Sequence, residues 1–136
     1  MNTTATLLGV MTEPKHDEQD NWTGAAISAS IEIEGPDAEG LIGIHRVGLN
    51  IDLSPALIDI VKVEGYKWKF KEFIRKRVVA CMKAIDEKYE GTTADTYYIY
   101  SQIMGKMPVL IEKAVARVYY SDNLRTGETF ESDARI

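Results

Sequence analysis

The sequence predicts an α+β fold, in which an N-terminal antiparallel β-meander of three or more strands packs against two to three C-terminal helices. Apolar and polar residues alternate through the first third of the chain, and this period of two is typical of strands with one solvated face. Apolar residues then recur every three or four positions, which indicates helices with one buried side. The length of 136 residues fits one domain, so we expect residues 1–136 to form a single α+β domain.

Three segments are predicted as strands. Residues 3–11 are rich in Thr, Leu and Val, and β-branched residues favour extended backbone. Residues 25–34 alternate, and the turn sequence GPDAEG separates them from a second alternating run over residues 41–53. The polar and acidic link over residues 12–20 predicts a mobile loop between the first two strands.

Ser54 and Pro55 predict the start of the first helix, because Ser caps a helix N-terminus and Pro at the first helical position loses no hydrogen bond. Gly65 can end this helix in a left-handed conformation. A longer helix is predicted over residues 67–90, followed by Gly91. Its apolar stripe consists of Phe70, Ile74, Val78, Cys81, Met82, Ile85 and Tyr89.

A third helix is predicted to begin at Thr92 or Thr93, either of which can cap it, and to end at Met104. The apolar segment over residues 108–120 is compatible with a helix or with a strand. β-Branched and aromatic residues dominate its second half, residues 115–120, so a final strand or hairpin is favoured there.

Two local features are compatible with more than one structure. Gly43 and Gly48 lie inside the third strand and predict a bulge or a close approach of backbone. In the segment YKWKFK, residues 66–71, aromatic residues alternate with lysines, which also suits a fourth strand. The long helix would then begin near Glu72 instead of near residue 67.

Charge is segregated along the chain. The segment GYKWKFKEFIRKR, residues 65–77, carries six Lys or Arg and one Glu, in a chain with a formal net charge of −5. Residues 1–52 carry nine acidic and two basic residues. Positive charge is unfavourable near a helix N-terminus, so we expect this basic block to meet negative charge.

Three sources of that negative charge are considered. One is a carboxylate of the same chain, from Glu13, Asp17, Glu18, Asp20, Glu32 or Glu34. A second is a neighbouring copy, and a third is an anionic partner such as a nucleic acid, a nucleotide or an acidic protein. The opposing interpretation is a helix face that simply lies in water.

The candidate contact residues combine this basic block with aromatic side chains. Aromatic rings between lysines can stack bases while the ammonium groups hold phosphates, and tyrosines are frequent in protein interfaces. On one helix, Tyr97 and Tyr100 would share a face with Met104 while Tyr98 points elsewhere. The full set is Lys67, Trp68, Lys69, Lys71, Arg75, Lys76, Arg46, Tyr97, Tyr98 and Tyr100.

No catalytic or cofactor motif is present in the sequence, and we predict no cofactor and no metal site. His45 alternates with apolar strand residues and is expected to be a core or interface histidine. Cys81, the single cysteine, is expected to act as a small core residue and excludes an internal disulfide. Asp86, Glu87 and Glu90 form an acidic cluster, but no second carboxylate helix accompanies it to complete a hard-cation site.

These observations predict a non-enzymatic binding or assembly protein that acts through homo-oligomeric and protein–protein contacts, as inhibitors, immunity proteins and structural components do. The alternative is a protein that captures a small anionic ligand such as a nucleotide. A nucleic-acid-binding protein that uses residues 67–77 comes third, because a pI of about 5.1 disfavours polyanions. No apolar run could span a membrane, and the first residues, MNTTATLLGVM, lack the positive charge of a signal peptide, so we expect a cytoplasmic location and no membrane partner.

Overall fold

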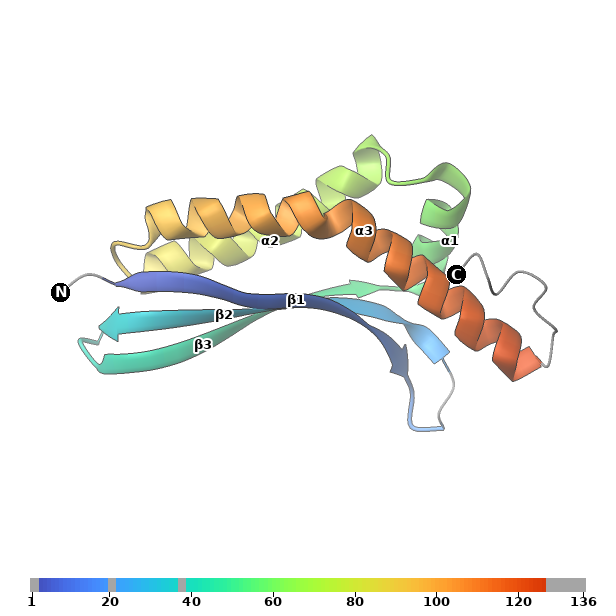
Figure 1. The fold of residues 1–136 in the computed structure, drawn as a ribbon, viewed down its shortest axis with the longest axis horizontal. Helices are drawn as coiled ribbons and strands as arrows, with labels where there is room; N and C mark the ends of the chain where they lie inside the picture. The colour runs from blue at the N-terminus through green and yellow to red at the C-terminus, as the bar shows by residue number, and fades with distance from the viewer. Residues whose placement is uncertain (1–2, 20–21, 37–38, 127–136) are drawn as a thin grey trace.

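The structure, a computed structural model, describes residues 3–19, 22–36 and 39–126. A three-stranded antiparallel sheet in the order β1-β2-β3 lies against one layer of three helices (Figure 1). The strands are β1 Thr4–His16, β2 Trp22–Pro36 and β3 Ile42–Leu53, and the helices are α1 Pro55–Glu64, α2 Trp68–Lys88 and α3 Thr93–Thr126. The predicted α+β class and its N-terminal meander are confirmed.

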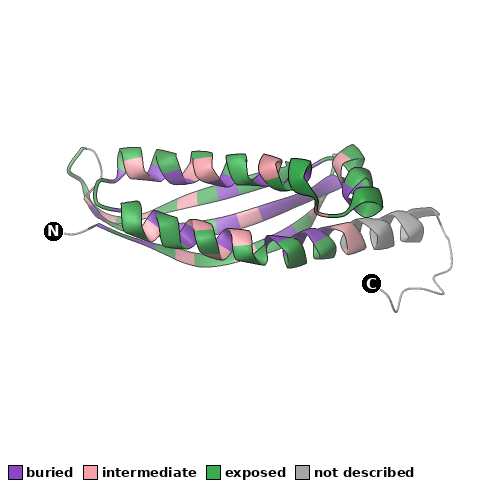
Figure 2. Cartoon of the chain, turned by 90° about the horizontal axis from the view of Figure 1, so that it is seen from above, coloured by how far each residue is buried: buried purple, intermediate pink, exposed green. Residues whose placement is uncertain are grey.

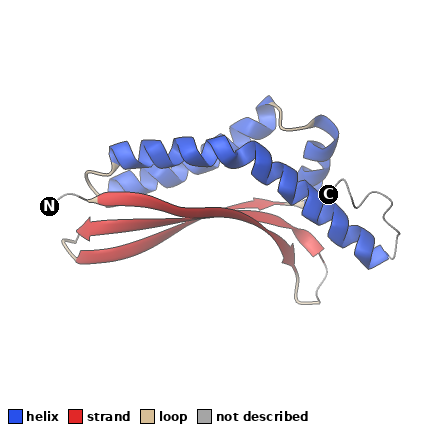
Figure 3. Ribbon diagram, in the orientation of Figure 1, coloured by secondary structure: helices blue, strands red, loops and turns tan. Residues whose placement is uncertain are grey.

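The helices cover one face of the sheet and leave the other face open (Figure 3). In the central strand β2, Ile27, Ile31 and Ile33 are buried beneath the helices. Ser30 and Glu34, which alternate with them, are exposed on the opposite face. The period of two in the sequence therefore separates the two faces of the sheet as predicted.

The core lies between the sheet and the antiparallel pair α2 and α3, which run side by side across it (Figure 2). From α2 the predicted stripe buries Phe70, Ile74, Val78, Met82 and Ile85. From α3 the main buried side chains are Ile99, Ile103, Met107 and Ile111. No described helix is both long and apolar enough to cross a membrane.

The boundaries of α1 follow from two local interactions. The Ser54 hydroxyl accepts a hydrogen bond of 3.2 Å from the Leu57 amide, which satisfies one of the free amides of the first turn. Gly65 ends the helix at φ 80°, and its amide donates to the Val61 carbonyl at 2.7 Å. Both residues limit the helix as predicted, although Gly65 combines its positive φ with an extended ψ of −175° and is not in the left-handed helical conformation.

Two predictions for the C-terminal part of the chain are wrong. One is the end of the third helix at Met104, and the other is the favoured final strand over residues 115–120. Helix α3 continues through Gly105 and Pro108, and residues 127–136 lie outside the described part of the chain. The buried side chains of Met107, Leu110, Ile111 and Ala114 extend the helical stripe beyond Gly105 and pack on the sheet. This tertiary packing outweighs the local preference of β-branched residues, while the missing amide of Pro108 accounts for the bend of α3 in Figure 1.

The prediction of a loop over residues 12–20 is also wrong for its first half. Strand β1 runs to His16, and its residues beyond Met11 pair with the start of β2. Polar side chains such as Glu13 are compatible with this strand because they lie on the open face of the sheet. The alternation that predicted the other strands is less regular along β1 as a whole, because the register shifts earlier in this strand, between Leu7 and Gly9.

The described part of the chain has no bulge at the glycines of β3 and no strand over residues 66–71. The pairing of β2 with β3 is continuous, so Gly43 and Gly48 mark no bulge, and a Cβ atom at either position would meet nothing within 4 Å. The segment over residues 66–71 forms no fourth strand, because α2 begins at Trp68. Its helical spacing buries Phe70 in the core, which a solvent-facing strand would not achieve.

Candidate binding surfaces

A pocket of about 590 Å³ lies between α1 and the first turns of α2, and we call it the Trp68 pocket. Phe70 is buried and forms part of its wall, with its ring 5.9 Å from that of Tyr66 in an edge-to-face contact. Trp68 lies at the surface with 74% of its side chain exposed, which is unusual for so large an apolar group. The other apolar lining residues are Leu57, Ile60 and Phe73.

Two lysines and one glutamate, Lys67, Lys69 and Glu64, line this pocket, so positive charge exceeds negative charge around it. Lys67 and Lys69 line it and are exposed, and neither forms a salt bridge with any described residue. Lys67 occupies the N-cap position of α2 but makes no side-chain capping hydrogen bond. The start of α2 thus combines the positive end of a helix dipole with two ammonium groups, which favours a carboxylate or another anion there.

The hypothesis that acidic residues of the loop or strands compensate the basic block is wrong for the described residues. Arg75 pairs with Glu72 on its own helix, Nε to Oε2 at 3.0 Å, and this contact lowers the pKa of Glu72. Lys71 and Lys76 are exposed and form no ion pair with the described part of the chain. Among the described residues, these exposed lysines are compatible with a solvated helix face, with a neighbouring copy or with an anionic partner.

A second hollow, of about 330 Å³, lies between α2 and α3 and brings together Arg75, Tyr97 and Tyr100. Tyr97 is exposed and Tyr100 is half-buried, so the predicted shared face exists, although it lines a groove between helices. Lys83 and Asp86 also line this α2–α3 groove. Because it presents both signs of charge, the groove does not concentrate one kind of ion.

Asp86, part of the acidic cluster noted in the sequence, is held by hydroxyl groups. The hydroxyls of Thr92 and Thr96 lie 2.9 Å from Asp86 Oδ1, across the turn that joins α2 to α3. This carboxylate therefore fixes the junction of two helices. No group of three His, Cys, Asp or Glu side chains that could hold a metal ion occurs among the described residues.

The remaining candidate residues lie elsewhere. Arg46 is on the open face of the sheet, 3.8 Å from Glu32, on the side opposite the helices. Tyr98 is exposed, and its hydroxyl accepts a hydrogen bond of 2.9 Å from Gln102 Nε2. The structure therefore divides the predicted site: one part lines the Trp68 pocket and one part lines the α2–α3 groove. Four of the predicted residues line neither, namely Arg46, Lys71, Lys76 and Tyr98.

His45 and Cys81 occupy the packed positions that the sequence predicted. The His45 ring lies 5.5 Å from the ring of Tyr89, and its buried Nε2 has no hydrogen-bond partner among the described residues. Cys81 is half-buried, and burial raises the pKa of its thiol. A raised thiol pKa disfavours the thiolate that a nucleophile requires.

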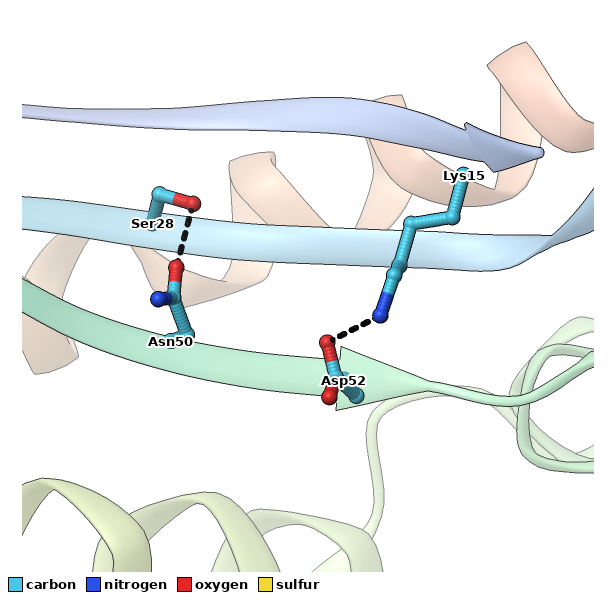
Figure 4. Close-up of polar contacts among 4 residues, drawn as sticks. All are labelled: Lys15, Ser28, Asn50 and Asp52. Atoms are coloured by element: carbon cyan, nitrogen blue, oxygen red, sulfur yellow. Dashed lines mark hydrogen bonds and ion pairs between the residues drawn. The ribbon is translucent and has the colours of Figure 1, made fainter. Parts of the chain in front are cut away.

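The open face of the sheet carries polar contacts that the sequence did not reveal. Lys15 of β1 reaches across β2 to Asp52 of β3, with 2.9 Å between Nζ and Oδ1, and Ser28 donates a hydrogen bond of 2.8 Å to Asn50 (Figure 4). The small side chain of Ala26 lies opposite Asp52 in the strand register and leaves room for this crossing. Such contacts depend on strand register, which the sequence alone does not specify.

The β2–β3 end of the sheet carries an apolar patch that sequence reasoning also missed. Ile42 and Ile44 are 62% and 64% exposed on the open face, and Leu41 beside them is exposed as well. Glu34 is the register partner of Ile44, so a carboxylate borders this patch. The alternation did place both isoleucines on the polar face, which was the available signal for an exposed apolar surface.

Comparisons with family models, with curated proteins and with solved structures find no significant match to this chain.

Proposed function

We propose that this chain is a non-enzymatic binding or assembly protein that acts through protein–protein contacts, including contacts between its own copies. The Trp68 pocket is the proposed docking surface. The observation that carries this proposal is the exposure of Trp68 at the mouth of an apolar pocket whose bordering lysines form no salt bridge with described residues.

The energetics of such a surface favour a protein partner. Large exposed aromatic side chains are frequent anchors of protein interfaces, and burial of one contributes about 2–3 kcal/mol. Phe70 and Phe73 hold the pocket in a fixed shape, which lowers the entropy lost on binding. Lys67 and Lys69 would select a partner segment with acidic residues and increase its rate of association.

Capture of a small anionic ligand is the second candidate, and one observation favours it. The N-terminus of α2 lacks a side-chain cap and lies beside two lysines, which suits a phosphate group. The predominantly apolar lining of the pocket favours an aliphatic or aromatic group beside that anion. A nucleotide, with an aromatic base and phosphates, is the ligand class that combines these features.

Self-association through the pocket is tested by sedimentation velocity over a wide range of protein concentrations. We expect the average mass of the wild-type protein to rise with concentration, and Trp68→Ala to weaken this association at least tenfold. Val109→Ser is the matched control, because Val109 is an exposed apolar residue of α3 that does not line the pocket. Equal association of Trp68→Ala and wild type would contradict the proposed docking surface.

The two candidate functions are separated by a thermal-shift measurement with ATP and with inorganic phosphate. A protein-docking surface predicts no change in melting temperature beyond the general effect of ionic strength. A rise with ATP that Trp68→Ala abolishes, in a protein that stays monomeric, would favour capture of an anionic ligand. A wild-type protein that is monomeric at every concentration would contradict self-association.

A further inference from the structure

We infer that the occupant of the Trp68 pocket is the β2–β3 end of a second copy of this chain. We call this surface the hairpin patch, and it consists of Ile42 and Ile44 of β3 with Glu34 of β2. The inference rests on the proposed function, because it names the segment that the pocket would take.

The hairpin patch combines apolar side chains with a carboxylate. Ile42 and Ile44 are two residues apart in β3, so both point to the open face of the sheet, which no helix covers (Figure 3). Glu34 pairs with Ile44 in the register and is exposed on the same face. Neighbouring exposed isoleucines beside a charged residue are typical of a surface that another molecule covers.

The pocket and the patch are complementary in chemistry. The pocket offers apolar walls, an uncapped helix start and an excess of positive charge, since Lys67 and Lys69 line it with Glu64, while the patch offers two aliphatic side chains and Glu34. A carboxylate at the start of α2 would accept hydrogen bonds from its free amides and pair with the lysines. The second copy would thus supply a carboxylate to lysines that form no salt bridge with the described residues of the same chain.

The two surfaces lie far apart on one molecule. The hairpin that joins β2 to β3 is at one end of the long axis, and the junction of α1 with α2 is toward the other end (Figure 1). They cannot meet within one copy, so the contact must join different copies head to tail. A contact of this kind leaves one pocket and one patch free at the ends of each pair, so its repetition is heterologous and produces closed rings or open filaments.

A twofold contact between two Trp68 pockets is less favourable. It would bring Lys67 and Lys69 of both copies close together with only Glu64 of each copy as a lining carboxylate, and an excess of like charge across an interface reduces affinity. The head-to-tail arrangement places opposite charges in contact and covers both exposed apolar surfaces.

The test uses two defective proteins that can complement each other. Trp68→Ala removes the pocket anchor and keeps the hairpin patch, whereas the double variant Ile42→Thr/Ile44→Thr removes the patch, retains β-branched strand residues and keeps the pocket. We expect sedimentation velocity to show that each variant alone associates at least tenfold more weakly than wild type. An equimolar mixture should form a heterodimer, because one intact interface remains, and no larger species.

The outcomes separate this inference from the proposed function. If the hairpin variant associates like wild type while Trp68→Ala does not, the pocket docks a different segment and the inference is overturned. If Trp68→Ala associates like wild type, the proposed docking surface itself is wrong. A mixture that stays monomeric although both variants are defective also overturns the head-to-tail contact.

A charge variant provides a second readout that does not remove apolar surface. We expect Glu34→Lys to weaken association at least tenfold at low ionic strength and less in 1 M salt, because salt screens the repulsion from Lys67 and Lys69. Pocket variant Lys67→Glu/Lys69→Glu mixed with Glu34→Lys should form a heterodimer, since the charges then match. Unchanged association of Glu34→Lys at low salt would contradict the proposed pairing.

Discussion

The main-chain amide of Ala5 donates a hydrogen bond of 2.9 Å to Asp95 Oδ2, although 90 residues separate the two in sequence. Ala5 lies in β1, an edge strand of the described sheet, and Asp95 lies in the first turn of α3. The carboxylate therefore satisfies an amide at a sheet edge and also lies at the positive end of a helix dipole. This contact fixes the start of α3 over β1.

We predict that Asp95→Ala lowers the free energy of unfolding by about 1.5–3 kcal/mol, because hydrogen bonds to charged groups and helix-dipole interactions both contribute. Asp95→Asn keeps an acceptor oxygen without the charge and should lose about half as much. Urea denaturation of the three proteins measures the difference. An Asp95→Ala protein as stable as wild type would show that the contact contributes nothing measurable.

Substitution by alanine is expected to affect stability much more at Phe70 than at Trp68. Phe70→Ala should lower the free energy of unfolding by about 3–5 kcal/mol, because it removes a buried ring from the core. Trp68→Ala should change it by less than about 0.5 kcal/mol, because its side chain is mostly exposed. Chemical denaturation compares the two, and a large loss for Trp68→Ala would place that side chain in the core instead of at a docking surface.

Gly24 and Gly48 form a matched pair of strand glycines with different backbone constraints. Gly24 has a φ of 125°, and a Cβ atom there would overlap the Leu53 carbonyl oxygen. We predict that Gly24→Ala lowers the free energy of unfolding by about 2–4 kcal/mol through strain and overlap. Gly48→Ala, where a Cβ atom has free space, should be within about 1 kcal/mol of wild type. Similar losses in thermal unfolding for both variants would contradict this distinction.

Tyr66 is predicted to make stability fall at alkaline pH. Burial of the phenol, and secondarily the neighbouring Tyr100, raise the pKa of Tyr66 in the folded protein above the unfolded value of about 10. As the pH rises beyond about 10, Tyr66 loses its proton in the unfolded chain before it does so in the folded protein. Ionisation therefore favours the unfolded chain, and the stabilisation that is present below that pH is lost.

Tyr66→Phe tests this expectation. The Tyr66 hydroxyl is buried and has no hydrogen-bond partner among the described residues, so its removal should leave stability at pH 7 unchanged or raise it by up to about 1 kcal/mol. The free energy of unfolding, measured between pH 8 and 11, should fall less steeply than in wild type. Identical pH profiles would show that Tyr66 ionises equally in both states.

Local patterns in the sequence were sufficient for most of the fold. The alternation around Ile27 and Ile33 defined the central strand, and Ser54 and Gly65 marked the limits of α1. These local patterns failed where contacts between distant segments of the chain decide the structure. Residues 115–120 favour a strand locally, but the apolar side chains of the preceding turns, such as Ile111 and Ala114, are buried in the core and the helix continues from them.

The candidate site was predictable in composition but not in arrangement. The sequence indicated the basic block and the tyrosines, because their side chains are unusual in number and spacing. It did not indicate that Trp68 faces a pocket while Phe70 enters the core, or that Arg46 lies on the opposite face of the molecule. Those facts depend on which side of α2 faces the core and on how the helices cross the sheet.

By itself the sequence determined the α+β class, the faces of the strands and the segregation of charge, because these depend on periodicity and on residue type. Only the tertiary structure decided which exposed groups come together. Packing brings α1 against the start of α2 and leaves Ile42 and Ile44 uncovered at the β2–β3 end, through contacts between segments far apart in the chain. No local pattern encodes such distances, since they follow from the way the whole core is filled.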